Sequence, residues 1–176
     1  MTRKKVIRIG LSEKDIDRAI KELEPYKREI IRKTELLRIK VAERISALAQ
    51  SGFNGAIVDD LTVESGGARK ADVLVSIDER ENVSVVIAAG EDVVWVEFGA
   101  GVYHNGFAGS SPHPKGTELG FTIGGYGKSN GKLQTWGFYE DGELRLTHGT
   151  PAIMPMYNAM KTICDETADI AKEVFK

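Results

Sequence analysis

The chain has one cysteine and no long hydrophobic run, and each shortage excludes a class of protein. A single cysteine, Cys164, cannot form an internal disulfide, and its apolar-flanked position in a helical segment favours a buried structural thiol. No apolar stretch approaches the roughly 20 residues that a helix needs to span a bilayer. Residues 1–5 are basic, but only three aliphatic residues follow before Gly10, too few for the core of a signal peptide. We therefore expect a cytosolic protein with a reduced thiol.

The sequence also lacks the patterns of the common enzyme classes. Thr122 stands where a phosphate-binding loop ending in Gly127-Lys128-Ser129 needs a glycine. Ser110-Ser111 lies near a histidine, but within a glycine-rich stretch that cannot hold catalytic geometry, and there is no Gly-x-Ser-x-Gly elbow. The three histidines are too widely spaced along the chain to predict a zinc site. These are His104, His113 and His148. We therefore predict no catalytic residue, no cofactor and no metal.

What is present is an uneven distribution of charge over 176 residues, a length that predicts a single domain, 1–176. Residues 1–50 hold 14 Lys/Arg and 8 Asp/Glu, a net charge of +6, whereas residues 51–176 hold 10 and 18, a net charge of −8. A basic segment can indicate nucleic-acid binding. The favoured interpretation is a solvated helix face with i,i+4 pairs such as Glu24–Arg28. A third is head-to-tail attraction between copies in a ring.

Apolar periodicity predicts a helical N-terminal segment, 12–51. Ser12 and Asp15 form a weakened capping box, and Pro25 predicts a break or kink. A longer helix follows, with an apolar stripe of period 3.6 that should lie across a sheet, and Gly52 is a plausible end. The stripe residues are Ile30, Leu37, Val41, Ile45 and Leu48.

The middle of the chain, 56–98, is rich in strand signals. Ala56–Val63 is the weakest of them, and the β-branched stretches around 73–77 and 82–89 flank a polar turn and predict an antiparallel hairpin. Residues 99–131 contain ten glycines and are expected to be a flexible loop that is ordered by neighbouring subunits. We predict an α+β fold, with a mainly antiparallel sheet packed by the long N-terminal helix and a C-terminal helix.

Two signals organise the C-terminal part. Asp141-Gly142 between apolar runs predicts a hairpin over 133–147. Pro155 suits the first turn of a helix over 155–175, because its missing N–H has no helical partner at that position.

Two short segments carry the most specific pattern. The first, 94–101, places Trp95, Glu97 and Phe98 before Gly99 and Gly101. A carboxylate among apolar neighbours needs a partner, because burying it alone is costly. The favoured partner of Glu97 is an intrachain cation or the backbone N–H groups of the 99–101 turn, and the alternative is a basic residue of the next subunit. The second segment is Gly149-Thr150-Pro151-Ala152, followed by Pro155.

These segments, in this order, resemble the head–tail joining (tail-completion) proteins of long-tailed bacteriophages and prophages, a group of neck, minor capsid or minor tail proteins. The resemblance covers residues 15–175, including the layout of a basic N-terminal helix, a β-rich middle, a glycine-rich loop and a C-terminal helix. The composition of 93–98 favours a strand, whereas Glu91-Asp92 suits the start of a helix, and the resemblance implies a short helix over 93–98 that ends at Gly99. It marks the following as structural or subunit-contact residues: Trp95, Glu97, Phe98, Gly99, Gly101, Pro151 and Pro155.

The resemblance implies a virion assembly protein and not an enzyme. The chain would be a homo-oligomer, a sixfold ring in the neck that can be a monomer in isolation. Its partners would be the connector and tail proteins, with no membrane and with nucleic acid only as DNA passing through the lumen. Its location would be the host bacterial cytoplasm during assembly and then the virion. The alternatives are a nucleic-acid-binding module using the basic helix and, less favoured, a small metal-dependent hydrolase using His104 or His113.

Overall fold

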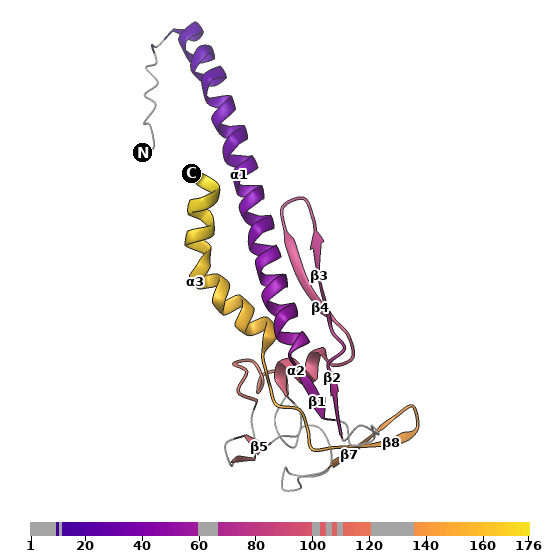
Figure 1. Ribbon diagram of the computed structural model, residues 1–176. Helices are drawn as coiled ribbons and strands as arrows, with labels where there is room; N and C mark the ends of the chain where they lie inside the picture. Colours follow the sequence, from indigo (N-terminus) through magenta and orange to yellow (C-terminus); the bar gives the residue numbers. More distant parts are fainter. Residues whose placement is uncertain are drawn as a thin grey trace.

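The structure, a computed structural model, describes residues 10, 12–59, 67–99, 103–104, 107–108, 111–120 and 136–176. Within them the chain is α+β, as predicted, with a long first helix and a shorter last helix lying side by side (Figure 1). The elements in chain order are α1 (Glu13–Asn54), β1 (Ile57–Asp59), β2 (Ala68–Lys70), β3 (Leu74–Glu79), β4 (Ser84–Ala89), α2 (Val93–Phe98), β5 (Tyr103–His104), β6 (Phe107–Ala108), β7 (Trp136–Glu140), β8 (Glu143–Thr147) and α3 (Pro155–Phe175).

Helix α1 is 42 residues long, which corresponds to about 63 Å. Its start follows the predicted capping box: Ser12 Oγ accepts from the Asp15 N–H at 3.3 Å and donates to the Asp15 carboxylate at 2.7 Å. Of the two outcomes expected at Pro25, the break does not occur, because the helix is continuous through that residue, and the kink stays a prediction. Pro25 and Lys21 both lie in an exposed part of α1, so water can satisfy the Lys21 carbonyl that loses its helical donor.

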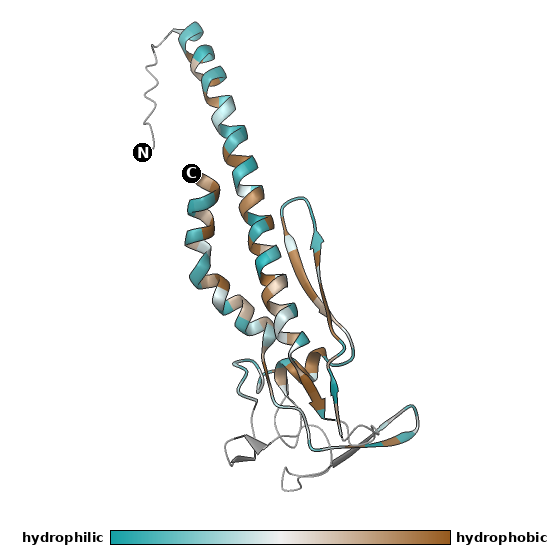
Figure 2. Ribbon diagram, in the orientation of Figure 1, coloured by the Kyte–Doolittle hydropathy of each residue, from teal (hydrophilic) through white to brown (hydrophobic). Residues whose placement is uncertain are grey.

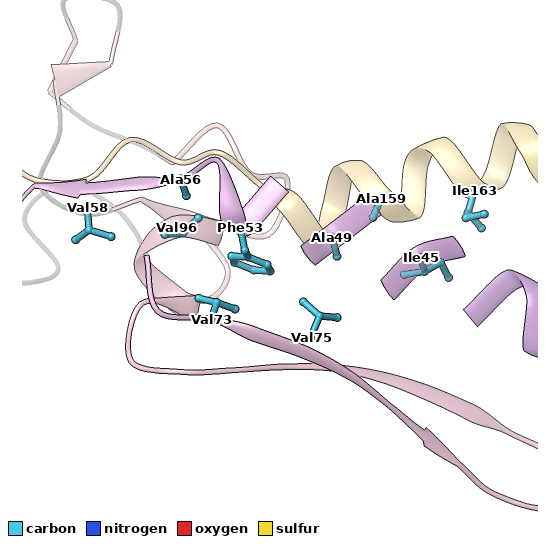
Figure 3. Packing of buried hydrophobic residues seen from close by; sticks show 10 residues of the cluster. All are labelled: Ile45, Ala49, Phe53, Ala56, Val58, Val73, Val75, Val96, Ala159 and Ile163. Atoms are coloured by element: carbon cyan, nitrogen blue, oxygen red, sulfur yellow. The ribbon is translucent and has the colours of Figure 1, made fainter. Parts of the chain in front are cut away.

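The hydrophobic core lies where the C-terminal half of α1 meets α3, the β3–β4 hairpin and α2 (Figure 3). Phe53 is its largest fully buried side chain, and burial of one such residue stabilises the fold by about 1.5–3 kcal/mol. Gln50 fixes the hairpin to α1, since its amide donates to the Val73 carbonyl at 3.0 Å and accepts from the Val75 N–H at 2.7 Å. The core residues are Ile45, Ala49, Phe53, Ala56, Val58, Val73, Val75, Val96, Ala159 and Ile163.

The strands form antiparallel pairs and not one continuous sheet within the described residues. The predicted hairpin around residues 78–82 is confirmed as β3 with β4, in the register Leu74↔Ala89 to Glu79↔Ser84. The hairpin at Asp141-Gly142 is also confirmed, and both turn residues have positive φ, 51° and 84°. The weak strand signal of 56–63 gives only β1, and residues 60–63 lie outside the described part.

Three helix predictions can be compared directly with the structure. The short helix over 93–98 and the start of the last helix at Pro155 are confirmed as α2 and α3. Gly52 does not end α1, which continues to Asn54. Its hydrogen side chain instead admits Pro155, because a Cβ at residue 52 would lie 2.9 Å from the Pro155 Cβ.

Cys164 corrects another prediction, because it is exposed on α3 and not buried. The residue falls on the outer side of the helix while its neighbour Ile163 enters the core. Helical periodicity alone therefore separates two adjacent apolar positions.

Among the described residues, no helix has the length and apolar character needed to cross a membrane, and hydropathy alternates along α1 and α3 (Figure 2).

Candidate functional site at the start of helix α3

Glu97 of α2 binds the first turn of α3. Its carboxylate is buried, 5% exposed for the whole residue, and accepts from the Met156 N–H at 2.8 Å and the Tyr157 N–H at 2.9 Å, one on each oxygen. The N-cap residue of α3, Met154, is left-handed (φ 59°) and makes no side-chain capping bond. Glu97 therefore acts as the cap of a helix that begins 58 residues later in the chain.

The first turn of α3 needs this external acceptor for a simple reason. The first N–H groups of a helix have no helical partner, and the helix start carries about half a positive charge. Pro155 has no N–H, and the Asn158 N–H already donates to the Met154 carbonyl at 2.9 Å. Met156 and Tyr157 hold the remaining donors, and one buried carboxylate satisfies both of them.

The backbone joins the same two segments. The Val96 carbonyl accepts from the Ile153 N–H at 2.8 Å and from the Met154 N–H at 3.3 Å. Gly99 ends α2 with φ 78°, and a Cβ there would lie 2.8 Å from the Ala152 nitrogen. Gly99 is thus required both by its conformation and by the close approach of the second segment.

The remaining predicted residues have different environments. Trp95 and Phe98 are partly buried, Pro155 is buried and Pro151 is exposed. Glu97 therefore has intrachain partners, but these are N–H groups of α3 and not those of the turn after Gly99 that the sequence analysis favoured. Gly101 lies outside the described residues.

His113 also contacts the carboxylate, and no sequence pattern predicted this contact. Its Nε2 lies 3.3 Å from Glu97 Oε1, and its Nδ1 accepts from the Lys115 N–H at 3.0 Å. Because Nδ1 accepts, the ring proton is assigned to Nε2, the nitrogen that faces Glu97. The ring is buried between Phe98 and Tyr157, with centroids 4.3 and 5.2 Å away.

This arrangement of His113 does not activate a nucleophile. Both ring nitrogens are engaged, one by Glu97 and one by a backbone N–H. Ser111 Oγ accepts from the His113 backbone N–H at 3.2 Å, so it is bound to the main chain of the same turn. Within the described part of the chain, no three His, Cys, Asp or Glu side chains gather into a metal site. The side chain of His104 lies outside that part.

A second buried carboxylate holds the other end of α2. Asp92 is 2% exposed and forms a bidentate ion pair with the Arg69 guanidinium at 2.6 and 2.8 Å. It also accepts from the Asp72 N–H at 2.8 Å. Sequence reasoning assigned Asp92 only to the start of the helix, but its side chain makes no capping bond there. The carboxylate instead ties α2 to β2.

Asp59 at the end of β1 binds the segment that leads into the second motif. Its Oδ2 accepts from the Thr147 hydroxyl at 3.0 Å and the His148 N–H at 2.5 Å, and its Oδ1 lies 3.3 Å from His148 Nδ1. Burial by itself would raise the pKa of the Asp59 carboxyl, but the bonds from His148 and Thr147 together outweigh it and lower the pKa. Asp59 therefore favours its charged form.

The chain matches no protein-family model, no curated protein and no solved structure. The site is thus interpreted from its own geometry. Glu97, Asp92 and Asp59 each accept from backbone N–H groups of distant segments, and these bonds fix α2, β2 and the approach to α3. The three carboxylates thus position chain segments, and their oxygens are engaged by structural donors.

Proposed function

We propose that the chain is a virion assembly protein of the head–tail interface of a long-tailed phage or prophage, where it completes the tail or joins it to the connector. The observation that carries the proposal is the joint between the two segments on which the resemblance rests. Val96 and Glu97 of the first segment bind Ile153, Met156 and Tyr157, which adjoin the residues of the second segment in the chain. Two segments about 50 residues apart in the chain are thus joined in space, which supports reading them as one structural feature.

A structural role fits the chemistry of the joint. The carboxylate of Glu97 accepts from two backbone N–H groups, one on each oxygen, and the His113 Nε2 lies 3.3 Å from one of these oxygens. A general base needs an oxygen free to take a proton from a substrate. Glu97 is better suited to fix the orientation of α3 on α2.

In the proposed sixfold ring, each copy presents two different complementary patches. The net charges of +6 and −8 on the two parts of the chain are candidates to supply them. Reversing the charge of Lys27, Arg28 and Lys33 together is expected to prevent ring formation, as seen by electron microscopy of assembled particles. Rings that form as well as wild-type rings would exclude this electrostatic version.

The function is tested by deleting the gene from the phage or prophage that encodes it. We expect filled heads and complete tails that accumulate separately, and restoration of joined particles when the intact gene is supplied on a plasmid. A matched plasmid with an early stop codon should not restore them. Joined, infectious particles in the deletion strain would refute the proposal.

The nucleic-acid alternative receives less support from the helix itself. Residues 13–54 hold ten Lys/Arg and eight Asp/Glu, so most of the basic excess precedes α1, at Arg3, Lys4, Lys5 and Arg8. Tight DNA binding that weakens steeply between low and moderate salt in a gel shift would revive this alternative.

A further inference from the structure

The N-terminal half of α1 carries an apolar stripe that the described residues leave exposed. Its side chains are 47–58% exposed, although they are the large aliphatic residues that normally lie in a core. We call this set the free α1 stripe: Ile16, Ile20, Leu23, Ile30 and Ile31. Four of them follow the alternating spacing of four and three residues that paired helices use, with Lys27 at the missing position.

The free α1 stripe continues the face that α1 already uses for packing. On the same side of the helix, Ile45 and Ala49 are buried against α3 and the β3–β4 hairpin. Helix α3 ends at Phe175, whose ring lies 5.9 Å from Lys33 Nζ, and α1 extends well beyond it (Figure 1). The 21 residues from 13 to 33 therefore continue a helix-packing surface for about 31 Å after its partner has stopped.

The charges beside the stripe change sign along the helix. Residues 13–24 hold five acidic and three basic side chains, whereas residues 25–36 hold two acidic and four basic ones. A second α1 laid antiparallel places the acidic half of each copy against the basic half of the other. A parallel copy would place like charge against like charge. The pattern is therefore complementary to itself in one orientation only.

We propose that the free α1 stripe binds the same stripe of a second copy of this chain, in an antiparallel pair whose two-fold axis passes near Pro25. This arrangement places Ile20 opposite Ile30 of the partner copy. It also places Lys27 of each copy beside Glu24 of the other, so the one charged position in the seam meets an opposite charge. A single Lys in an otherwise apolar seam is a device that fixes register. The pair forms in the isolated protein and does not rest on the proposed function.

The test is the oligomeric state of the full chain, measured by sedimentation velocity over a concentration series. The wild-type protein is expected to form dimers. Lys27→Glu places two like-charged pairs in the seam and should weaken the dimer at least about tenfold, or ~1.4 kcal/mol. Arg32→Glu changes the charge equally on the opposite face of α1 and should dimerise like the wild type. Circular dichroism on each variant confirms that the helices are retained.

Mixing gives a sharper test of the charge contact. Glu24→Lys should also weaken self-association, because it faces Lys27 of the partner copy. An equal mixture of the Glu24→Lys and Lys27→Glu proteins restores both contacts in the mixed pair and should recover dimers. Failure of the mixture to recover dimers would overturn the proposed register.

Orientation is tested by disulfide trapping in a Cys164→Ser background. Ile20→Cys and Ile30→Cys proteins should cross-link to each other under mild oxidation, and each alone should cross-link poorly. A wild-type protein that stays monomeric throughout the series would overturn the proposal. Efficient self-cross-linking of Ile20→Cys, or loss of dimers in Arg32→Glu equal to that in Lys27→Glu, would do the same.

Discussion

Replacing Glu97 by alanine should strongly destabilise the protein. The change removes the acceptor of the Met156 and Tyr157 N–H groups and leaves both without it at a partly buried helix start. It also removes the carboxylate that faces the positive end of the α3 dipole and the partner of the His113 ring. The effect therefore extends from α3 to the turn that carries His113.

The size of the effect follows from the geometry. A hydrogen bond to a charged group contributes about 1.5–3 kcal/mol, so two of them give roughly 3–6 kcal/mol. Partial rehydration of the freed N–H groups places the expected loss near the lower end, about 3–4 kcal/mol. For a domain of this size, each kcal/mol lowers the melting temperature by about 2–4 °C, so a fall of roughly 10 °C is expected. Glu97→Gln keeps the shape and one acceptor oxygen and should lose about 2 kcal/mol.

The measurement is urea unfolding followed by circular dichroism, together with a thermal melt. Glu91→Ala is the matched control, because it removes an exposed carboxylate just before α2. We expect the urea midpoint to be highest for Glu91→Ala, lower for Glu97→Gln and lowest for Glu97→Ala, with an unchanged slope of free energy against urea. If Glu97→Ala costs no more than Glu91→Ala, Glu97 is not the cap of α3.

Three further predictions follow from the same contacts. In urea unfolding, Gly99→Ala should destabilise the protein by about 1–3 kcal/mol more than Gly142→Ala. Both glycines have positive φ, but only a Cβ at residue 99 meets backbone atoms. Equal losses would exclude the close approach of residue 99 to the Ala152 backbone. Asp92→Ala should cost about 3 kcal/mol in the same assay, since it removes the buried carboxylate that binds the Arg69 guanidinium and the Asp72 N–H. A loss no larger than that of a typical surface change would show that Asp92 does not make these bonds in solution. The pKa of Asp59 is lowered in the folded protein, so its stabilisation is present above the ordinary value of 3.8 and is lost as pH falls through the folded-state value. Asp59→Asn should therefore flatten the loss of stability at acidic pH, and an unchanged pH profile of stability would contradict this prediction.

The sequence by itself determined the elements whose signals are local. Asp141-Gly142 specifies a tight turn through its tolerance of positive φ, Pro155 marks a helix start through its missing N–H, and the polar turn of 78–82 separates two β-branched strands. Each rule depends on residues within one turn of each other. The apolar period of 3.6 residues, also a local signal, predicted the long amphipathic stripe of α1.

Only the tertiary structure decided how the carboxylates are used. The donors to Glu97 lie 59 and 60 residues away in the chain, and the Arg69 partner of Asp92 lies 23 residues away, so no local pattern could select them. Tertiary context also left Pro25 in solvent, where the helix continues through it. A carboxylate between apolar neighbours in the sequence predicts that partners are needed, because burying it unpaired is costly. Which donors satisfy it depends on which distant segments the fold brings to it.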